Sequence, residues 1–166
     1  CSSDLKLEVD DQVAAANYMK SLPYVNKDRV GVWGWSFGGY MTSLLMTKVN
    51  TVYKTGIAVA PVINWRFYDN IYTERYMGTL QSNPTGFDAN APMAYADKLK
   101  GNYLLIHGTG DDNVHFQNSA EMVKKLVELN KPFQSAYYPD RNHGISGGNT
   151  RLHLFSLMTN FILENL

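Results

Sequence analysis

The sequence is poor in cysteine, in excess charge of either sign and in long apolar runs. Its single cysteine, Cys1, excludes an intrachain disulfide. The 15 basic and 15 acidic side chains cancel, so no net field favours nucleic acid or an anionic membrane. No apolar run approaches the roughly 20 residues that span a bilayer. We therefore expect no nucleic-acid partner and no membrane contact from this segment.

Metal-binding and phosphate-binding signatures are also missing. No two of the four histidines have the spacing of a metal site. The one Gly-rich turn that resembles a phosphate-binding loop lacks the Lys-Ser/Thr pair that such loops need. We expect neither a metal nor another cofactor.

What the chain does contain is enough apolar material for one domain. It has 166 residues, of which 45% are hydrophobic and 18% are charged, and this suits a single compact core. Aromatic residues make up 13%, including eleven Tyr, and such polar-tipped rings suit a substrate pocket as well as a core.

Apolar patterning predicts strands that alternate with helices. Residues 64–77 are expected to be partly helical, and residues 80–96 to form a loop because of their Pro and Gly content. The first strand is expected to be buried on both faces. Alternation of this kind indicates an α/β fold with a mostly parallel sheet of about four strands and helices on both faces. The expected strands are residues 29–35, 55–60, 103–107 and 133–138, and the expected helices are residues 7–22, 40–49, 119–130 and 152–166.

A G-x-S-x-G motif, Gly34-Trp35-Ser36-Phe37-Gly38, lies between the first strand and the following helix. In such an elbow the serine sits on a sharp turn with its hydroxyl exposed, and the flanking glycines let strand and helix approach. The N–H of Phe37 would then donate to an oxyanion. The alternative is a plain Gly-rich turn, which the strand-to-helix context disfavours.

The elbow requires an acid and then a histidine later in the chain. Asp111 follows the third strand and is our choice for the acid, with Asp112 as the alternative; one of the two is expected to cap the next helix. His143 follows the fourth strand and is the expected base. His107, His115 and His153 are interpreted as ordinary. A Ser36–Asp111–His143 triad on a partial α/β-hydrolase fold is the resulting prediction.

Four longer motifs extend the pattern: GWSFGGY (Gly34 to Tyr40), APV (Ala60 to Val62), WRFYDNIYTERYM (Trp65 to Met77) and HGTGDDNVHF (His107 to Phe116). These motifs resemble the prolyl oligopeptidase family of serine peptidases, and the resemblance runs over nearly the whole chain. It implies a serine exopeptidase that forms an acyl-enzyme and releases N-terminal dipeptides from peptide substrates, with proline or alanine preferred at the second position. Phe37 departs from the tyrosine that the family often has there, but the main-chain N–H remains.

The resemblance also implies substrate-binding residues. Asn113 would hold a substrate carbonyl, and an apolar slot would hold the proline ring. The alternative is that Tyr68, Tyr72 and Tyr76 merely pack at four-residue spacing on one face of a helix. The slot would be lined by Val62, Trp65, Tyr68, Tyr72 and Val114.

In the family, a β-propeller and an earlier part of the hydrolase domain precede the region that this chain resembles. They supply acidic residues that hold the substrate amine and a tyrosine of the oxyanion hole. We therefore expect residues 1–166, which begin with Cys rather than Met, to be the C-terminal part of the hydrolase domain and to have little or no activity alone. The first strand would be an exposed sheet edge that self-associates.

Two other functions remain as alternatives. A carboxylesterase or an acylaminoacyl peptidase would share the triad, and a non-catalytic scaffold would share the fold alone.

Overall fold

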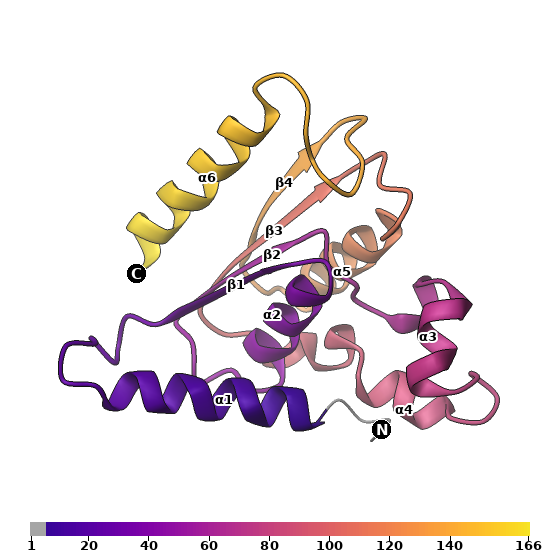
Figure 1. The fold of residues 1–166 in the computed structure, drawn as a ribbon, viewed down its shortest axis with the longest axis horizontal. Helices are drawn as coiled ribbons and strands as arrows, with labels where there is room; N and C mark the ends of the chain where they lie inside the picture. Colours follow the sequence, from indigo (N-terminus) through magenta and orange to yellow (C-terminus); the bar gives the residue numbers. More distant parts are fainter. Residues whose placement is uncertain (1–5) are drawn as a thin grey trace.

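The computed structural model describes residues 6–166, and their centre is one parallel four-stranded sheet (Figure 1). The strand order is the chain order, and each strand pairs in parallel with the next. This confirms the predicted α/β class. The strands are β1 (Gly31–Trp35), β2 (Thr55–Val59), β3 (Asn102–Gly108) and β4 (Gln134–Tyr138).

Helices cover both faces of the sheet, as Figure 1 shows. On one face α2 and α5 lie against the strands, with α1 packed outside α2, while α6 crosses the opposite face. Within the described residues, no helix is long and apolar enough to cross a membrane. The helices are α1 (Lys6–Ser21), α2 (Phe37–Thr47), α3 (Asn70–Met77), α4 (Pro84–Ala89), α5 (Gln117–Glu128) and α6 (Thr150–Asn165), with 3₁₀ turns η1 (Trp65–Phe67) and η2 (Pro92–Lys98).

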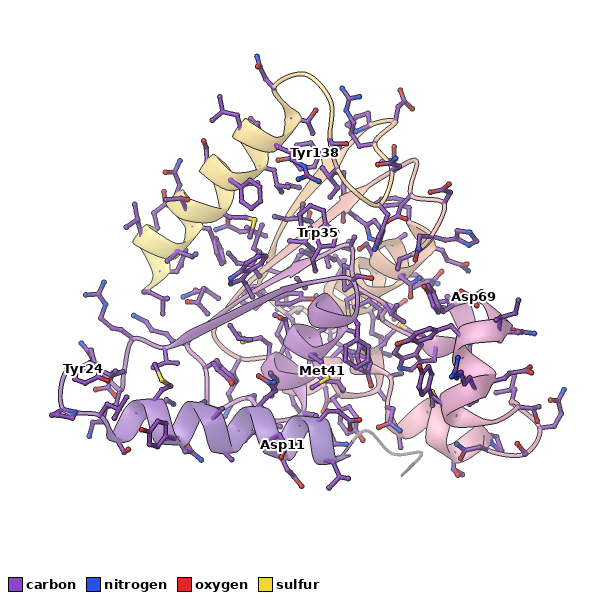
Figure 2. All side chains as sticks on the ribbon, viewed as in Figure 1. Asp11, Tyr24, Trp35, Met41, Asp69 and Tyr138 are labelled. Carbon is purple, nitrogen blue, oxygen red and sulfur yellow. The ribbon has the colours of Figure 1, made fainter. Side chains whose placement is uncertain are left out.

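The two central strands are apolar throughout because both of their faces are buried. Side chains alternate along a strand, so Ile57 and Ile106 point toward α6 while Ala58 and Leu105 point toward α2 and α5. Each of these two strands thus contributes to two cores, and burying one large aliphatic side chain contributes roughly 1.5–3 kcal/mol. Figure 2 shows side chains filling the space between α6 and the sheet.

The sequential strand order brings the functional loops to one edge. Connections between parallel neighbours are right-handed, so strands added in one direction place their crossover helices on one face and their carboxyl ends together. The loops after β1, β2 and β3 are tied there by main-chain hydrogen bonds from Ser36 to Val59, from Ala60 to Ile106 and from Thr109 to Tyr138, at 2.9, 2.7 and 3.0 Å.

The prediction of a loop at residues 80–96 is wrong. This segment contains α4 and the start of η2, and a proline stands at the beginning of each. Proline is tolerated at the first helical position, where its missing N–H has no intrahelical acceptor to satisfy. Asn83 accepts from the N–H of Gly86 and caps α4. Pro84 and Pro92 therefore start helices here and do not mark irregular chain.

The expectation that the first strand is buried on both faces is also wrong. β1 pairs only with β2 among the described strands, so it is an edge strand. Gly31 and Trp33 are exposed, and the Trp33 side chain is 55% accessible. The expected exposed edge is therefore present, and it carries an indole ring.

Candidate active site

Ser36 lies on the sharp turn between β1 and α2. Its backbone has φ 59° and ψ −117°, a conformation that costs a non-glycine residue about 1–3 kcal/mol and persists only where the surroundings enforce it. A hydrogen bond of 2.9 Å from the Ser36 N–H to the Val59 carbonyl fixes one side of the turn. The helix begins at Phe37, three residues before the predicted start, so it follows the serine directly.

Two glycines permit the close approach of strand and helix, but they are not the pair that the motif suggests. A Cβ on Gly34 would lie 2.2 Å from the main chain of Gly38, and one on Gly39 would lie 2.8 Å from the Val59 carbonyl oxygen. A Cβ on Gly38 would meet nothing within 4 Å. Glycine is therefore required at positions 34 and 39. At Gly34 the end of β1 contacts the main chain of the first turn of α2, and at Gly39 that turn contacts the end of β2.

The first turn of α2 offers main-chain donors beside Ser36. Within the helix, the N–H of Tyr40 is the first to find an acceptor, the Ser36 carbonyl at 2.9 Å. The N–H of Phe37 therefore has no intrahelical acceptor, and it stands at the positive end of the helix dipole. An oxyanion that forms next to Ser36 is stabilised by such a donor.

The carboxylate of Asp111 lies between His143 and a tight turn of its own chain. Its Oδ2 atom is 2.7 Å from Nδ1 of His143. Its Oδ1 atom accepts from the N–H groups of Asn113 and Val114, at 3.0 and 2.9 Å. Asp111 is buried, whereas the His143 side chain is 25% exposed. The structure thus brings Asp111 and His143 together with the acid beneath the ring.

Asp111 remains ionised despite this burial. Burial acts to raise the pKa of the carboxyl, but hydrogen bonds from His107, His143 and the Asn113 N–H outweigh it and hold the pKa well below its usual range. A charged carboxylate orients the imidazole and stabilises the imidazolium that forms when His143 accepts a proton.

Asp112 is exposed, and the expectation that one of the two aspartates caps the following helix is wrong. The residue before α5 is Phe116, and no side chain caps the helix. Asp111 instead satisfies N–H groups in the turn that precedes it.

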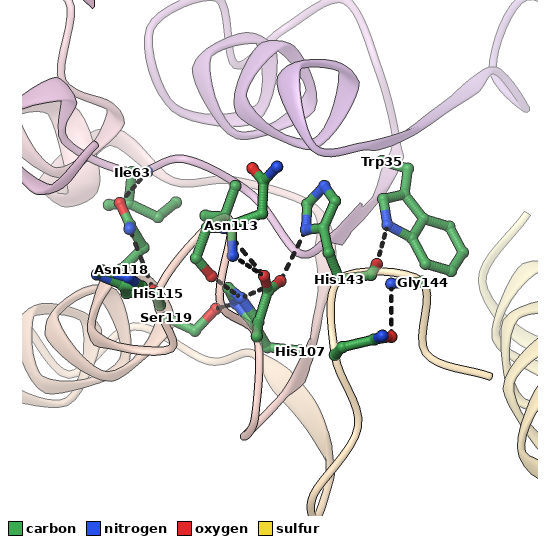
Figure 3. A network of polar contacts seen from close by, with 12 residues as sticks. Trp35, Ile63, His107, Asn113, His115, Asn118, Ser119, His143 and Gly144 are labelled. Carbon is green, nitrogen blue, oxygen red and sulfur yellow. Dashed lines mark hydrogen bonds and ion pairs between the residues drawn. The ribbon is translucent and has the colours of Figure 1, made fainter. Parts of the chain in front are cut away.

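His107, which the sequence analysis interpreted as ordinary, lies in direct contact with the acid. Its ring is fully buried, and Figure 3 labels it within the polar network. Nε2 is 3.2 Å from Asp111 Oδ2 and 2.8 Å from the Val114 carbonyl, and Nδ1 is 2.6 Å from the hydroxyl of Ser119. The only sequence signal was a histidine at the end of an apolar strand, four residues before the acid.

Ser36 and His143 are linked through the residue that precedes the serine. The Trp35 indole N–H donates to the main-chain carbonyl of His143 at 2.9 Å, so the histidine loop is attached to the elbow (Figure 3). Among the described residues, no hydrogen bond joins the Ser36 hydroxyl to the His143 ring. Because Nδ1 faces Asp111, Nε2 is the ring nitrogen available to the Ser36 hydroxyl. Hydrogen bonds between a nucleophile and its base often form fully only when substrate binds.

An aromatic cluster lies next to the elbow. Trp65 stacks on Tyr72 with ring centroids 5.9 Å apart and planes 19° apart, and the edge of Tyr68 meets both rings at 5.8 and 5.5 Å. Trp65 is almost fully buried, while Tyr72 is 40% exposed. Val62 and Val114 are buried in the same core cluster, at 2% and 0% exposure, and support the rings from below.

The helix-face interpretation of the three tyrosines fails for Tyr68. Tyr68 ends η1, and α3 begins after Asp69, whose carboxylate caps the helix by accepting from the Tyr72 N–H at 2.8 Å. Figure 2 labels Asp69 at this end of α3. Tyr72 and Tyr76 share the helix and are both substantially exposed, so they do not form core packing.

Asn113 is oriented by a tyrosine. The Tyr68 hydroxyl donates to Asn113 Oδ1 at 2.9 Å, which leaves the amide NH₂ to donate outward. Burial and the neighbouring Asp69 raise the pKa of Tyr68, so its hydroxyl stays protonated and remains a donor at neutral pH. The amide NH₂ of Asn113 could therefore donate a hydrogen bond to a carbonyl group placed beside the ring cluster.

No group of three or more His, Cys, Asp or Glu side chains able to hold a metal ion occurs within residues 6–166. The chemistry available at the edge is that of a hydroxyl, an imidazole, a buried carboxylate and a helix N-terminus.

Other proteins are similar in sequence to this chain. A model of the prolyl oligopeptidase family matches residues 5–166. Dipeptidyl peptidase 4 of Felis catus is 46% identical over 160 residues, which cover 95% of this chain and 21% of that protein. Prolyl endopeptidase FAP of Mus musculus is 45% identical over the same length, with the same shares. The chain therefore spans about a fifth of the length of the relatives that it matches.

Solved structures of similar proteins have the same fold as this chain. The crystal structure of Porphyromonas gingivalis dipeptidyl peptidase 4 superposes with a TM-score of 0.95 at 48% identity, over 97% of this chain and 23% of that one. A putative dipeptidyl aminopeptidase IV from Bacteroides ovatus gives a TM-score of 0.93 at 40% identity, over 96% and 22%. Sequence and structure together place this chain in the prolyl oligopeptidase family.

Proposed function

We propose that the protein carrying this chain is a serine exopeptidase that releases N-terminal dipeptides with proline or alanine at the second position. The observation that carries the proposal is the 2.7 Å contact between Asp111 and His143 at the edge of the sheet where Ser36 follows β1. The names of the relatives, which include dipeptidyl peptidases and prolyl endopeptidases, support the same reaction type.

In the proposed reaction His143 Nε2 takes the proton of the Ser36 hydroxyl as the oxygen attacks the carbonyl carbon of the second substrate residue. Asp111 accepts a hydrogen bond from Nδ1 and stabilises the imidazolium. The N–H of Phe37 donates to the oxyanion. The intermediate then collapses, and the leaving amine receives the proton from His143. Water repeats these steps on the acyl-enzyme and frees the dipeptide.

The aromatic cluster serves as the slot for the second residue. Trp65, Tyr68 and Tyr72 present ring faces and edges that suit a small rigid apolar ring such as that of proline. Val62 and Val114 back these rings. Asn113 donates from its amide NH₂ to a substrate carbonyl other than the one under attack, since its own oxygen is engaged by Tyr68.

The isolated 166-residue chain is proposed to have little activity. The relatives are about five times longer, and the family resemblance assigns the groups that hold the substrate amine and one oxyanion donor to segments outside this chain. Loss of one such donor costs about 10² to 10³ in rate. Turnover of the isolated chain at the rate of the longer protein would contradict this.

Three chromogenic substrates test the proposal on the whole protein. A Gly-Pro anilide with a free amine should be hydrolysed, and its N-acylated form should be hydrolysed far more slowly because an exopeptidase needs the amine. A simple aryl ester should also be a poor substrate. Preference for the acylated anilide would indicate an endopeptidase or acylaminoacyl peptidase, preference for the ester would indicate an esterase, and no hydrolysis of any would indicate a non-catalytic scaffold.

A further inference from the structure

His107 is a buried titratable side chain that the proposed reaction does not use. It stands near the end of β3, its ring is fully buried, and it lies between the acid and the first turn of α5. Buried polar groups are costly unless their partners are in place, so a buried imidazole in this position requires an account of each nitrogen.

The partners determine which nitrogen carries the proton. Nε2 faces two acceptors, the carboxylate of Asp111 at 3.2 Å and the carbonyl of Val114 at 2.8 Å. Nε2 must therefore be protonated and donate. Nδ1 faces only the Ser119 hydroxyl at 2.6 Å, which can donate to it. A ring with its proton on Nε2 therefore satisfies both nitrogens, with Nε2 donating and Nδ1 accepting from the Ser119 hydroxyl.

The Nε2 proton of His107 also contacts the turn that contains Asp111. Asp111 Oδ1 accepts from the Val114 N–H, while the Val114 carbonyl accepts from His107. Asp111 Oδ2 accepts hydrogen bonds from two imidazole rings, that of His107 in the protein interior and that of His143, which is partly exposed. The carboxylate is thus held by four donors, and it has one orientation that satisfies them all.

We propose that His107 is a positioning residue for the acid. Its ring, set by Ser119 on α5, fixes the carboxylate of Asp111 and the Val114 main chain so that Oδ2 faces His143. This inference rests on the proposed function. An imidazole suits the task because it carries a donor and an acceptor on opposite edges of one rigid ring, and so it spans from the acid loop to α5.

Kinetics of variants of the whole protein test the effect on rate. His107→Phe keeps a ring but loses both polar atoms, so kcat for a Gly-Pro anilide should fall by about 10- to 100-fold with little change in KM. His107→Gln, which restores a donor toward Asp111 but cannot also reach Ser119, should recover part of the loss. Ser119→Ala should give a smaller fall in the same direction.

Tyr103→Phe is the matched control. Tyr103 is buried on the same strand and its hydroxyl lies 2.8 Å from that of Ser43, so the variant also loses a buried hydrogen bond. It should lower the melting temperature while leaving kcat unchanged. Equal falls of kcat in His107→Phe and Tyr103→Phe, or unchanged kcat in the His107 and Ser119 variants, would overturn the inference.

Nitrogen-15 NMR of histidine in the unmodified protein gives a readout that needs neither a variant nor activity. His107 should show a proton on Nε2 and none on Nδ1, and Ser119→Ala should shift its Nδ1 signal. A proton on Nδ1, or on both nitrogens, would overturn the inference even if His107→Phe fails to fold. If the unmodified protein hydrolyses no Gly-Pro anilide, the proposed function is wrong, while the NMR result still decides how His107 contacts Asp111.

Discussion

Oδ2 of Asp111 lies 2.7 Å from Nδ1 of His143, although 32 residues separate the two in the sequence. The contact forms because β3 and β4 are parallel neighbours whose carboxyl ends meet at one edge of the sheet. The carboxylate is buried and the ring is 25% exposed, so the charge lies on the inner side of the ring and the ring reaches the surface.

The low pKa of Asp111 predicts a specific loss of stability in acid. Because the folded-state pKa lies below the unfolded value of about 3.9, the ionised carboxylate stabilises the fold above that pH. The contribution is lost as the pH falls through the folded-state pKa. Asp111→Asn should therefore lower the free energy of unfolding at neutral pH, and the difference from the unmodified protein should shrink steadily below about pH 4.

Denaturant unfolding at a series of pH values measures this difference. Asp112→Asn makes the same chemical change on an exposed neighbour and should give a small difference at every pH. A difference for Asp111→Asn that stays constant down to about pH 2 would contradict the prediction.

The sharp turn at Ser36 predicts that replacement of Gly34 by alanine lowers stability much more than replacement of Gly144 does. Gly34→Ala places a methyl group 2.2 Å from the main chain of Gly38, which cannot move without shifting α2. We expect a loss of about 3 kcal/mol or more in the free energy of unfolding, or a failure to fold. Gly144→Ala is the control, since its new atom would come no closer than 3.5 Å to any neighbour. Equal melting temperatures for the two variants would count against this account of the elbow.

The aromatic slot predicts a substrate-binding effect on one face of α3. Tyr72→Ala removes the ring that stacks on Trp65 and should raise KM for a Gly-Pro anilide about tenfold, equivalent to about 1.4 kcal/mol. Ile71→Ala, at the adjacent position on the same helix, changes a side chain that is 92% exposed and should leave KM unaltered. Similar KM values for the two variants would mean that the ring cluster is packing alone.

The edge strand predicts self-association of the isolated chain. Within residues 6–166, β1 pairs with a strand on one side only and exposes the Trp33 ring, and such edges pair with other chains. Sedimentation at micromolar concentration should show dimers or larger species, and Trp33→Lys should shift them toward monomer. Val127→Lys replaces a side chain that is 64% exposed on α5 and should have less effect. A monomeric unmodified chain would refute this prediction.

The fold class follows from patterning, because fully buried strands such as β2 and β3 are unbroken apolar runs bounded by turns. The burial of β1 and the starts of the helices were predicted less well. β1 has the same apolar content as a central strand, and only the absence of a described neighbour makes it an edge. Pro84 and Pro92 suit a loop as well as a first helical position, and the local sequence does not separate the two.

Within the site, the chain order of Ser36, Asp111 and His143 was sufficient to select three candidates. It could not reveal His107, because that residue acts through contacts with α5 and with the Val114 carbonyl that depend on tertiary packing. The choice of Asp111 over Asp112 agrees with burial, which the sequence leaves open.

The most direct test of the account is to identify the residue that a fluorophosphonate probe modifies, by mass spectrometry of the labelled protein. We predict a single adduct on the Ser36 hydroxyl, absent in Ser36→Ala and formed about 10⁴-fold more slowly in Asp111→Asn. Modification of a different residue, or labelling of Ser36→Ala at the rate of the unmodified protein, would contradict the proposed role of Ser36.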